Sequence, residues 1–139
     1  MSHWATQSIF YHIYPLGCCG APPQNDFQSA PHSRLERLYG WMDYWEHSGV
    51  NALYVGPLFE ASTHGYDTAD YFTVDRRLGT NETLSRWIQV LHQRQMRVIL
   101  DAVFNHVGRD FWAFKDVQRR SPDSPAGHGF CEVPGQLKS

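Results

Sequence analysis

The chain has 139 residues, a net charge of -2 and a hydrophobic content of 42%, which suits one ordinary domain. Charged residues make up 19% and form no long run of one sign, which argues against a nucleic-acid partner. No apolar stretch reaches the length of a membrane span, residues 1–7 show no signal-peptide pattern, and the three cysteines form no disulfide or zinc-ligand pattern. We therefore expect a cytoplasmic protein with free thiols.

Aromatic residues are the one compositional excess, at 14%. Two explanations are open. The rings fill a core, since they carry large buried areas, or a few of them form a stacking surface for a ligand such as a sugar. Composition does not separate the two.

Strand-like and helix-like segments alternate from the start of the chain. Residues 9–14 are β-branched and aromatic and predict a short buried strand, followed by a polar loop over residues 20–31. Ser33-Arg34-Leu35-Glu36 has the capping-box pattern that opens a helix, and Gly49 is placed to end that helix in a left-handed conformation. The helix is expected to bury one apolar stripe, formed by Leu35, Leu38, Met42 and Trp45.

The same order of elements then repeats. Residues 50–55 predict a second strand, and a long polar and aromatic loop runs over residues 58–79. Thr80 or Asn81 is expected to cap a second helix, whose buried face is Leu84, Trp87, Ile88 and Leu91. Residues 97–104 are almost continuously apolar and predict a third strand.

Continuous apolar strands joined by helices indicate a parallel sheet that is buried on both faces. We expect residues 1–106 to be the first three βα units, without the third helix, of an incomplete (β/α)8 TIM barrel. A doubly wound open sheet is the rival, but no Gly-rich phosphate loop follows the first strand. Residues 110–117 predict a short helix, and residues 107–139 are either the start of an insert or an aberrant, disordered tail.

Polar and aromatic residues cluster after the second and third strands, over residues 62–71 and 101–106. In barrel enzymes this carboxyl-terminal rim carries the active site. Alternation along the third strand should point Asp101, Val103 and Asn105 to one side. Asp101 needs a partner, because an unpaired buried carboxylate is costly. One interpretation is therefore a structural Asp101 paired with a basic residue, with His106 incidental.

The chain resembles the alpha-amylase family of glycoside hydrolases (glycoside hydrolase family 13). Asp101, Asn105 and His106 match that family's Asp-x-x-x-Asn-His signature at the end of strand three. The His-Gly-Tyr-Asp-Thr-Ala-Asp-Tyr segment, residues 64–71, is similar to the loop after strand two in the cyclomaltodextrinase and neopullulanase branch. Residues 10–15 look like the first strand of the family. The likeness covers roughly residues 8–117.

The resemblance implies retaining hydrolysis or transglycosylation of α-glucosidic bonds, with a maltodextrin or cyclodextrin as the partner. Tyr66 would stack under the sugar ring whose bond is cut, and His106 would donate a hydrogen bond to a sugar hydroxyl. Asp101 would be a buried organiser of the site rather than the nucleophile. Asn105 is a calcium ligand in many amylases, although other branches hold no metal there. His64 either lines the site or is simply solvated.

The residues that perform the family's chemistry are not found in this chain. Retaining hydrolysis needs a nucleophile and a general acid about 5–5.5 Å apart, and the family carries them on later strands. The acidic residues after Asn105 do not stand in the family's motif contexts: Asp110, Asp116, Asp123 and Glu132. Thr63 replaces the Asp of the oligo-1,6-glucosidase branch, which disfavours that specificity. A non-catalytic fragment, or an unrelated α/β domain that matches by chance, is the alternative.

Overall fold

The computed structural model describes residues 3–120 and 125–126. Within them a three-stranded parallel sheet has the order β1-β2-β5, with β1 at Phe10–Ile13, β2 at Ala52–Val55 and β5 at Arg97–Leu100. The predicted order of strands and helices and the parallel pairing are confirmed, although each strand is shorter than predicted. No helix in the described part of the chain is long and apolar enough to cross a membrane.

The first predicted helix has the predicted position, but its first part is a 3-10 helix and not an α-helix. It begins as a 3-10 helix, η2 (Arg34–Trp41), and continues as α2 (Met42–His47). The capping box is wrong: Ser33 has φ -68° and ψ 51° and makes no side-chain cap hydrogen bond, because an N-cap normally needs extended backbone. Gly49 does adopt the predicted left-handed conformation, at φ 77°.

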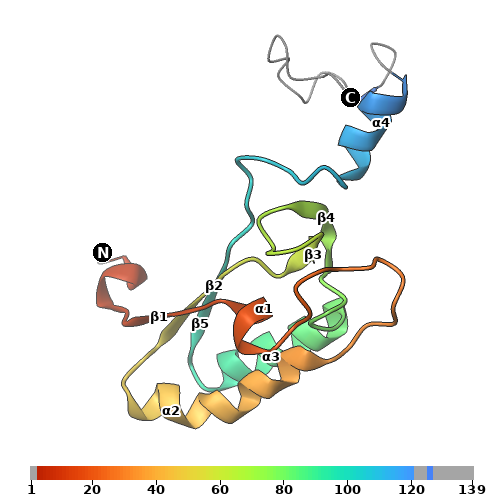
Figure 1. Ribbon diagram of the computed structural model, residues 1–139. Coiled ribbons are helices and arrows are strands. Elements are labelled where there is room, and N and C mark those ends of the chain that lie inside the picture. The colour runs from red at the N-terminus through yellow and green to blue at the C-terminus, as the bar shows by residue number, and fades with distance from the viewer. Residues whose placement is uncertain (1–2, 121–124, 127–139) are drawn as a thin grey trace.

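The second predicted helix is confirmed as α3 (Asn81–Gln93). Thr80 is extended, as an N-cap should be, and its hydroxyl accepts a hydrogen bond from the backbone N–H of Thr83 at 3.2 Å. The Thr83 hydroxyl in turn accepts from the Thr80 N–H at 3.3 Å. Both helices lie on the same side of the three-stranded sheet (Figure 1).

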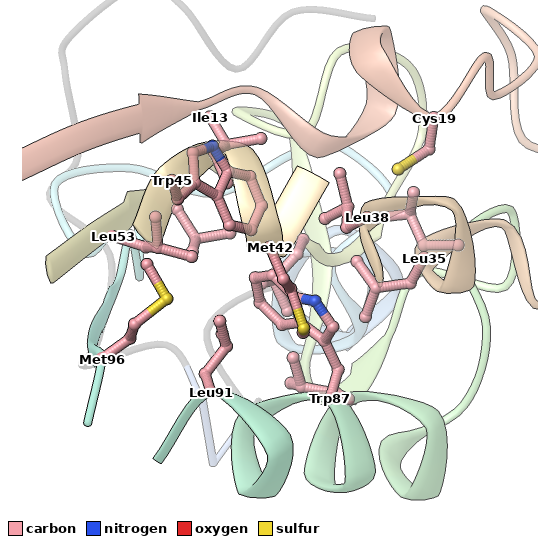
Figure 2. Close-up of a cluster of buried hydrophobic side chains, with 14 of the residues drawn as sticks. Ile13, Cys19, Leu35, Leu38, Met42, Trp45, Leu53, Trp87, Leu91 and Met96 are labelled. Atoms are coloured by element: carbon pink, nitrogen blue, oxygen red, sulfur yellow. The ribbon is translucent and has the colours of Figure 1, made fainter. Parts of the chain in front are cut away.

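The core forms between these helices and the sheet. The predicted stripes meet there, and Figure 2 shows Trp45 and Leu53 facing Met42, Leu91 and Trp87. Trp87 is 0% exposed and Trp45 is 1% exposed, so the largest rings of the helices belong to the core. The predicted helix faces are confirmed, with Ile88 only partly buried.

The predicted loop over residues 58–79 contains an antiparallel hairpin, β3 (Phe59–Ala61) and β4 (Thr68–Val74). Sequence periodicity missed it because β3 is short, its register with β4 is irregular, and its central pair is Glu60 opposite Asp70. The short elements η1 (Trp4–Gln7) and α1 (Pro15–Cys18) were also not expected. The helix predicted near residues 110–117 is present as α4 (Trp112–Arg120).

The third predicted strand ends early. β5 stops at Leu100, and Val103 has a positive φ of 51°, so residues 101–105 do not continue as an extended strand. The predicted alternation of Asp101, Val103 and Asn105 is therefore wrong. The predicted tail falls mostly on residues 121–124 and 127–139, which lie outside the described residues, and the domain boundary at residue 106 stays a prediction.

Within the described residues the helices cover one face of the sheet, and the other face, which a closed barrel would bury, is open to solvent. Strand register puts Phe10 beside Ala52, and puts His12, Tyr54 and Ile99 in one row. Alternation places these side chains on the face opposite the helices. Phe10 is 41% exposed and Ile99 is 37% exposed. His12 and Arg97 are also exposed on this face, so the open face is accessible and carries both apolar and polar side chains.

The 139-residue polypeptide should therefore self-associate and unfold over a broad temperature range, because the open face and the parallel edges of β1 and β5 favour contact between copies. Size-exclusion chromatography at several concentrations, binding of a hydrophobic dye and a thermal melt would measure this. Ile99→Thr should reduce dye binding, because Ile99 lies on the open face. Phe72→Ser is the control: Phe72 is 84% exposed but lies on the hairpin and not on the open face, so its loss should reduce dye binding less. A monomer with one sharp transition would contradict the expectation.

Candidate functional site

The two segments singled out in the sequence meet beyond the carboxyl ends of β2 and β5. The ring Nε2 of His106 lies 2.7 Å from the backbone oxygen of Tyr66, and the N–H of Gly108 donates to the oxygen of Thr68 at 2.8 Å. A Cβ on Gly108 would lie 2.3 Å from the Asp67 oxygen, so only glycine permits this approach. The rim loops thus form one connected surface.

Tyr71 joins the same two segments, and sequence reasoning did not single it out. Its hydroxyl lies 2.9 Å from the backbone oxygen of Val103 and 2.9 Å from that of His106. Its ring contacts Phe111 edge-on, with centroids 5.7 Å apart. The sequence offered one sign of this role, since Tyr71 is the last residue of the 64–71 motif. A buried tyrosine hydroxyl usually needs a hydrogen-bond partner.

Asp101 is half-buried and is held by neutral donors. The hydroxyl of Tyr54 donates to its Oδ2 at 3.0 Å, and the N–H of Val103 donates to its Oδ1 at 3.0 Å. The hydrogen bond to the Asp101 carboxylate, followed by desolvation, raises the pKa of Tyr54, so the phenol stays a donor. Within residues 3–120 and 125–126 the side-chain partner of Asp101 is therefore a phenol, in place of the basic residue that the alternative expected.

Tyr66 and His64 lie side by side on the rim. Tyr66 is 42% exposed, and the centroids of the two rings are 6.0 Å apart. The ring nitrogen Nδ1 of His64 accepts from the Tyr66 N–H at 3.2 Å and lies 3.6 Å from Asp67 Oδ1. The backbone oxygen of His64 accepts from the Tyr14 hydroxyl at 2.8 Å. His64 therefore helps to shape the Tyr66 turn while its side chain stays exposed.

The contact between His106 and Tyr66 constrains what His106 can offer a ligand. If the neutral ring donates from Nε2 to the Tyr66 carbonyl, its Nδ1 is an acceptor, and protonation makes Nδ1 a donor. The predicted bond from His106 to a sugar hydroxyl therefore requires the protonated ring or release of Tyr66. That role stays a prediction.

A buried ion pair fixes the base of the hairpin, and it was not predicted. Asp75 is 0% exposed and Arg77 is 5% exposed. The guanidinium binds the carboxylate through two nitrogens, at 2.8 and 2.7 Å. It also donates to the backbone oxygens of Thr63 at 2.7 Å and Pro22 at 3.0 Å. One side chain thereby ties three separate loops together.

The described residues place no cluster of carboxylates around Asn105. Calcium takes six to eight oxygen ligands, usually including carboxylates. Asn105 is exposed, and residues 3–120 and 125–126 contain no group of three or more His, Cys, Asp or Glu side chains that could hold a metal ion. Calcium at Asn105 remains an expectation of the family resemblance alone.

The acidic residues after Asn105 that the structure describes are engaged in ion pairs. Asp110 pairs with Lys115 at 2.7 Å and accepts from the Ser62 hydroxyl at 2.7 Å. The hydrogen bond from Lys115, followed by that from Ser62, lowers the pKa of Asp110. Asp116 pairs with Arg120 at 2.9 Å. These contacts give both side chains a structural role, and Asp123 and Glu132 lie outside the described residues.

A family model described as "Alpha amylase, catalytic domain" matches residues 34–136. The chain belongs to the alpha-amylase family. A cyclomaltodextrinase from Bacillus sp is 38% identical over 135 residues, which is 87% of this chain and 24% of that enzyme. Neopullulanase 2 from Thermoactinomyces vulgaris is 36% identical over 136 residues, which is 87% of this chain and 23% of that enzyme.

Solved structures support the same family. The cyclic alpha-maltosyl-(1→6)-maltose hydrolase from Arthrobacter globiformis, in complex with maltose, is 34% identical with a TM-score of 0.79. The match covers 98% of this alpha-amylase-family chain and 34% of the hydrolase. The chain thus spans about a quarter of the curated relatives and a third of this solved structure. The predicted fold, part of a TIM barrel, is confirmed.

Asp75→Asn should loosen the loops that Arg77 holds, because it leaves a buried guanidinium without its counter-charge. Breaking such a pair costs about 3–5 kcal/mol, which corresponds to roughly two to four orders of magnitude in local opening. Hydrogen exchange measured by mass spectrometry should show this over residues 20–31 and 60–68. Asp43→Asn is the matched control. It also removes the carboxylate partner of an arginine, Arg94, but the Asp43 side chain is 77% exposed, so that ion pair is not buried. Equal exchange in both variants would contradict the assignment.

Proposed function

We propose that these residues form the sugar-binding part of an enzyme that hydrolyses or transglycosylates α-glucosidic bonds in maltodextrins or cyclodextrins, with retention of configuration. The observation that carries the proposal is the meeting of Tyr66, His106 and Asp101 at one barrel rim, joined by the bond between His106 and the Tyr66 carbonyl. Relatives named cyclomaltodextrinase and neopullulanase support this substrate class.

Tyr66 is suited to hold the scissile sugar. Its ring is 42% exposed, so one face can take the apolar side of a pyranose. The electron-rich face of an aromatic ring also favours positive charge, and such charge develops at the anomeric carbon in the oxocarbenium-like transition state. Stacking at this position therefore supports both binding and reaction.

Asp101 is suited to organise the site. Tyr54 and the Val103 N–H occupy one lone pair on each carboxylate oxygen, and each oxygen can accept a further bond. Two fixed donors hold the carboxylate in one orientation at the end of β5. It can then accept hydrogen bonds from sugar hydroxyls without acting as a nucleophile.

A second proposal is that the chain by itself binds sugar weakly or not at all and performs no chemistry. The observation that favours it is that Asp110 and Asp116 lie outside the strands of the sheet and are paired with Lys115 and Arg120, and neither stands in the sequence context of the family's nucleophile or general acid. A Gly-x-Arg-x-Asp strand in the same reading frame would favour the first proposal. We also propose a cytoplasmic location, supported by a 34% identical relative named intracellular maltogenic amylase from Bacillus subtilis.

The 139-residue polypeptide should show no glycosidase activity, because binding without an acid and a nucleophile gives little rate. Purified chain would be assayed against maltotriose, cyclodextrin and an aryl maltoside, with a mock purification as the control. Turnover of the aryl maltoside above that control, at a rate proportional to the concentration of the purified chain, would contradict the second proposal.

Tyr66→Ala should impair a complete barrel that carries these residues. In a chimera, this chain would replace the segment that it matches in the Bacillus cyclomaltodextrinase. The kcat/KM of the chimera for cyclodextrin would then be measured with and without the substitution. The expected loss is about 2–4 kcal/mol of transition-state stabilisation, the scale of one lost contact. His106→Asn should cost less, because an amide still donates. Tyr39→Ala is the matched control, at 37% exposed on η2. An unchanged kcat/KM in Tyr66→Ala would refute the stacking role.

A further inference from the structure

The turn that follows β5 is strained at one residue. Val103 has a left-handed φ of 51°, which is unfavourable for a β-branched side chain because its substituents crowd the backbone. Among residues 3–120 and 125–126 the other non-glycine residues with positive φ are Phe27 and Gln95, and neither is β-branched. A strained conformation of this kind persists only where neighbouring contacts hold it.

Side chains engage both backbone polar groups of Val103. Its N–H donates to Asp101 Oδ1 at 3.0 Å, and its carbonyl oxygen accepts from the Tyr71 hydroxyl at 2.9 Å. The first bond orients the carboxylate of the candidate sugar site. The second attaches the turn to β4, which carries Tyr71. The left-handed peptide is therefore the link between Asp101 and Tyr71.

The Tyr71 hydroxyl also contacts the far end of the turn. It lies 2.9 Å from the backbone oxygen of His106, so its single proton is shared between two carbonyl oxygens. The ring Nε2 of His106 lies 2.7 Å from the Tyr66 oxygen. One phenol thus holds both the strained residue and the residue whose ring contacts the candidate stacking platform.

Aromatic neighbours fix the position of this phenol. The Tyr71 ring is half-buried, and it contacts Phe111 edge-on, with centroids 5.7 Å apart. Phe59 on β3 and Phe104 in the turn also lie beside it, with centroids 6.5 and 6.0 Å away. Rings from three segments limit where the hydroxyl can move, so it is a rigid anchor for the turn.

We propose that Tyr71 is a positioning residue of the candidate sugar site. Its hydroxyl holds Val103 in the left-handed conformation and thereby sets the orientation of Asp101 and His106. The proposal rests on the proposed function for the roles of those two side chains, whereas the contacts within the turn are independent of it. Without the hydroxyl, Val103 relaxes toward negative φ, and its N–H turns away from the Asp101 carboxylate.

The test separates the hydroxyl from the ring, and the strain from the side chain. Tyr71→Phe removes only the hydroxyl, and Tyr39→Phe is the matched control, because Tyr39 is a partly exposed phenol on η2, away from the rim. Val103→Gly and Val103→Ala are each combined with Tyr71→Phe. Glycine adopts positive φ readily and alanine does not, so only glycine should compensate for the lost hydroxyl.

The first readout is hydrogen exchange of the full 139-residue chain, measured by mass spectrometry over residues 101–108. Tyr71→Phe should speed this exchange roughly tenfold, the scale of one neutral hydrogen bond, while Tyr39→Phe leaves it unchanged. Adding Val103→Gly should restore the slower exchange, and adding Val103→Ala should not. Exchange over α3 reports global unfolding and should stay the same in Tyr71→Phe.

Three results of this experiment would overturn the proposal. They are unprotected amides over residues 101–108 in the parent chain, an equal acceleration over α3 in Tyr71→Phe, and equal rescue by glycine and alanine at position 103. Each would show that the hydroxyl does not hold the left-handed turn.

The second readout is kcat/KM of the chimera for cyclodextrin. Tyr71→Phe should lower it roughly tenfold, and Val103→Gly should restore it. If Tyr66→Ala impairs the chimera and Tyr71→Phe does not, the positioning role is overturned and the proposed function stands. If Tyr66→Ala has no effect, the proposed function fails, and hydrogen exchange alone decides whether Tyr71 holds the turn.

Discussion

The buried pair of Asp75 and Arg77 is the constraint on which the rim depends. Two charges taken out of water must have their hydrogen-bonding groups satisfied, and here the partners come from separate loops. Arg77 reaches the backbone oxygens of Pro22 and Thr63, while Asp75 accepts from the N–H of Ala61. The polar stretches of the sequence are thereby fixed around one ion pair instead of around an apolar core.

The hairpin, once fixed by this ion pair, also holds the segment that follows β5 in place. Once Thr63 and Ala61 are held, β4 can place Thr68 and Tyr71 against the segment that follows Asp101. Tyr71 reaches the oxygens of Val103 and His106, and Gly108 lies against Asp67 and Thr68. The candidate sugar site is therefore a product of loop–loop hydrogen bonding, and the three strands supply only its base.

The candidate binding residues and the later acidic residues differ in their surroundings. The ring of Tyr66 is partly exposed, and two donors hold the carboxylate of Asp101 in one orientation. The later acids Asp110 and Asp116 are instead neutralised by Lys115 and Arg120. This division is consistent with an alpha-amylase-family segment that spans about a quarter of its curated relatives.

The sequence by itself determined the order of elements, the helix faces and the family. Apolar spacing identified Leu35, Trp45, Trp87 and Leu91 as core because burial of a helical stripe depends on local periodicity, and the Asp-x-x-x-Asn-His motif located the rim. Only the tertiary structure decided the 3-10 start of η2, the β3–β4 hairpin, the phenol partner of Asp101 and the ion pair of Asp75 with Arg77. These features depend on contacts between residues far apart in the chain, or on the burial of polar groups, which local sequence patterns do not predict. Residue spacing and propensity therefore could not reveal them.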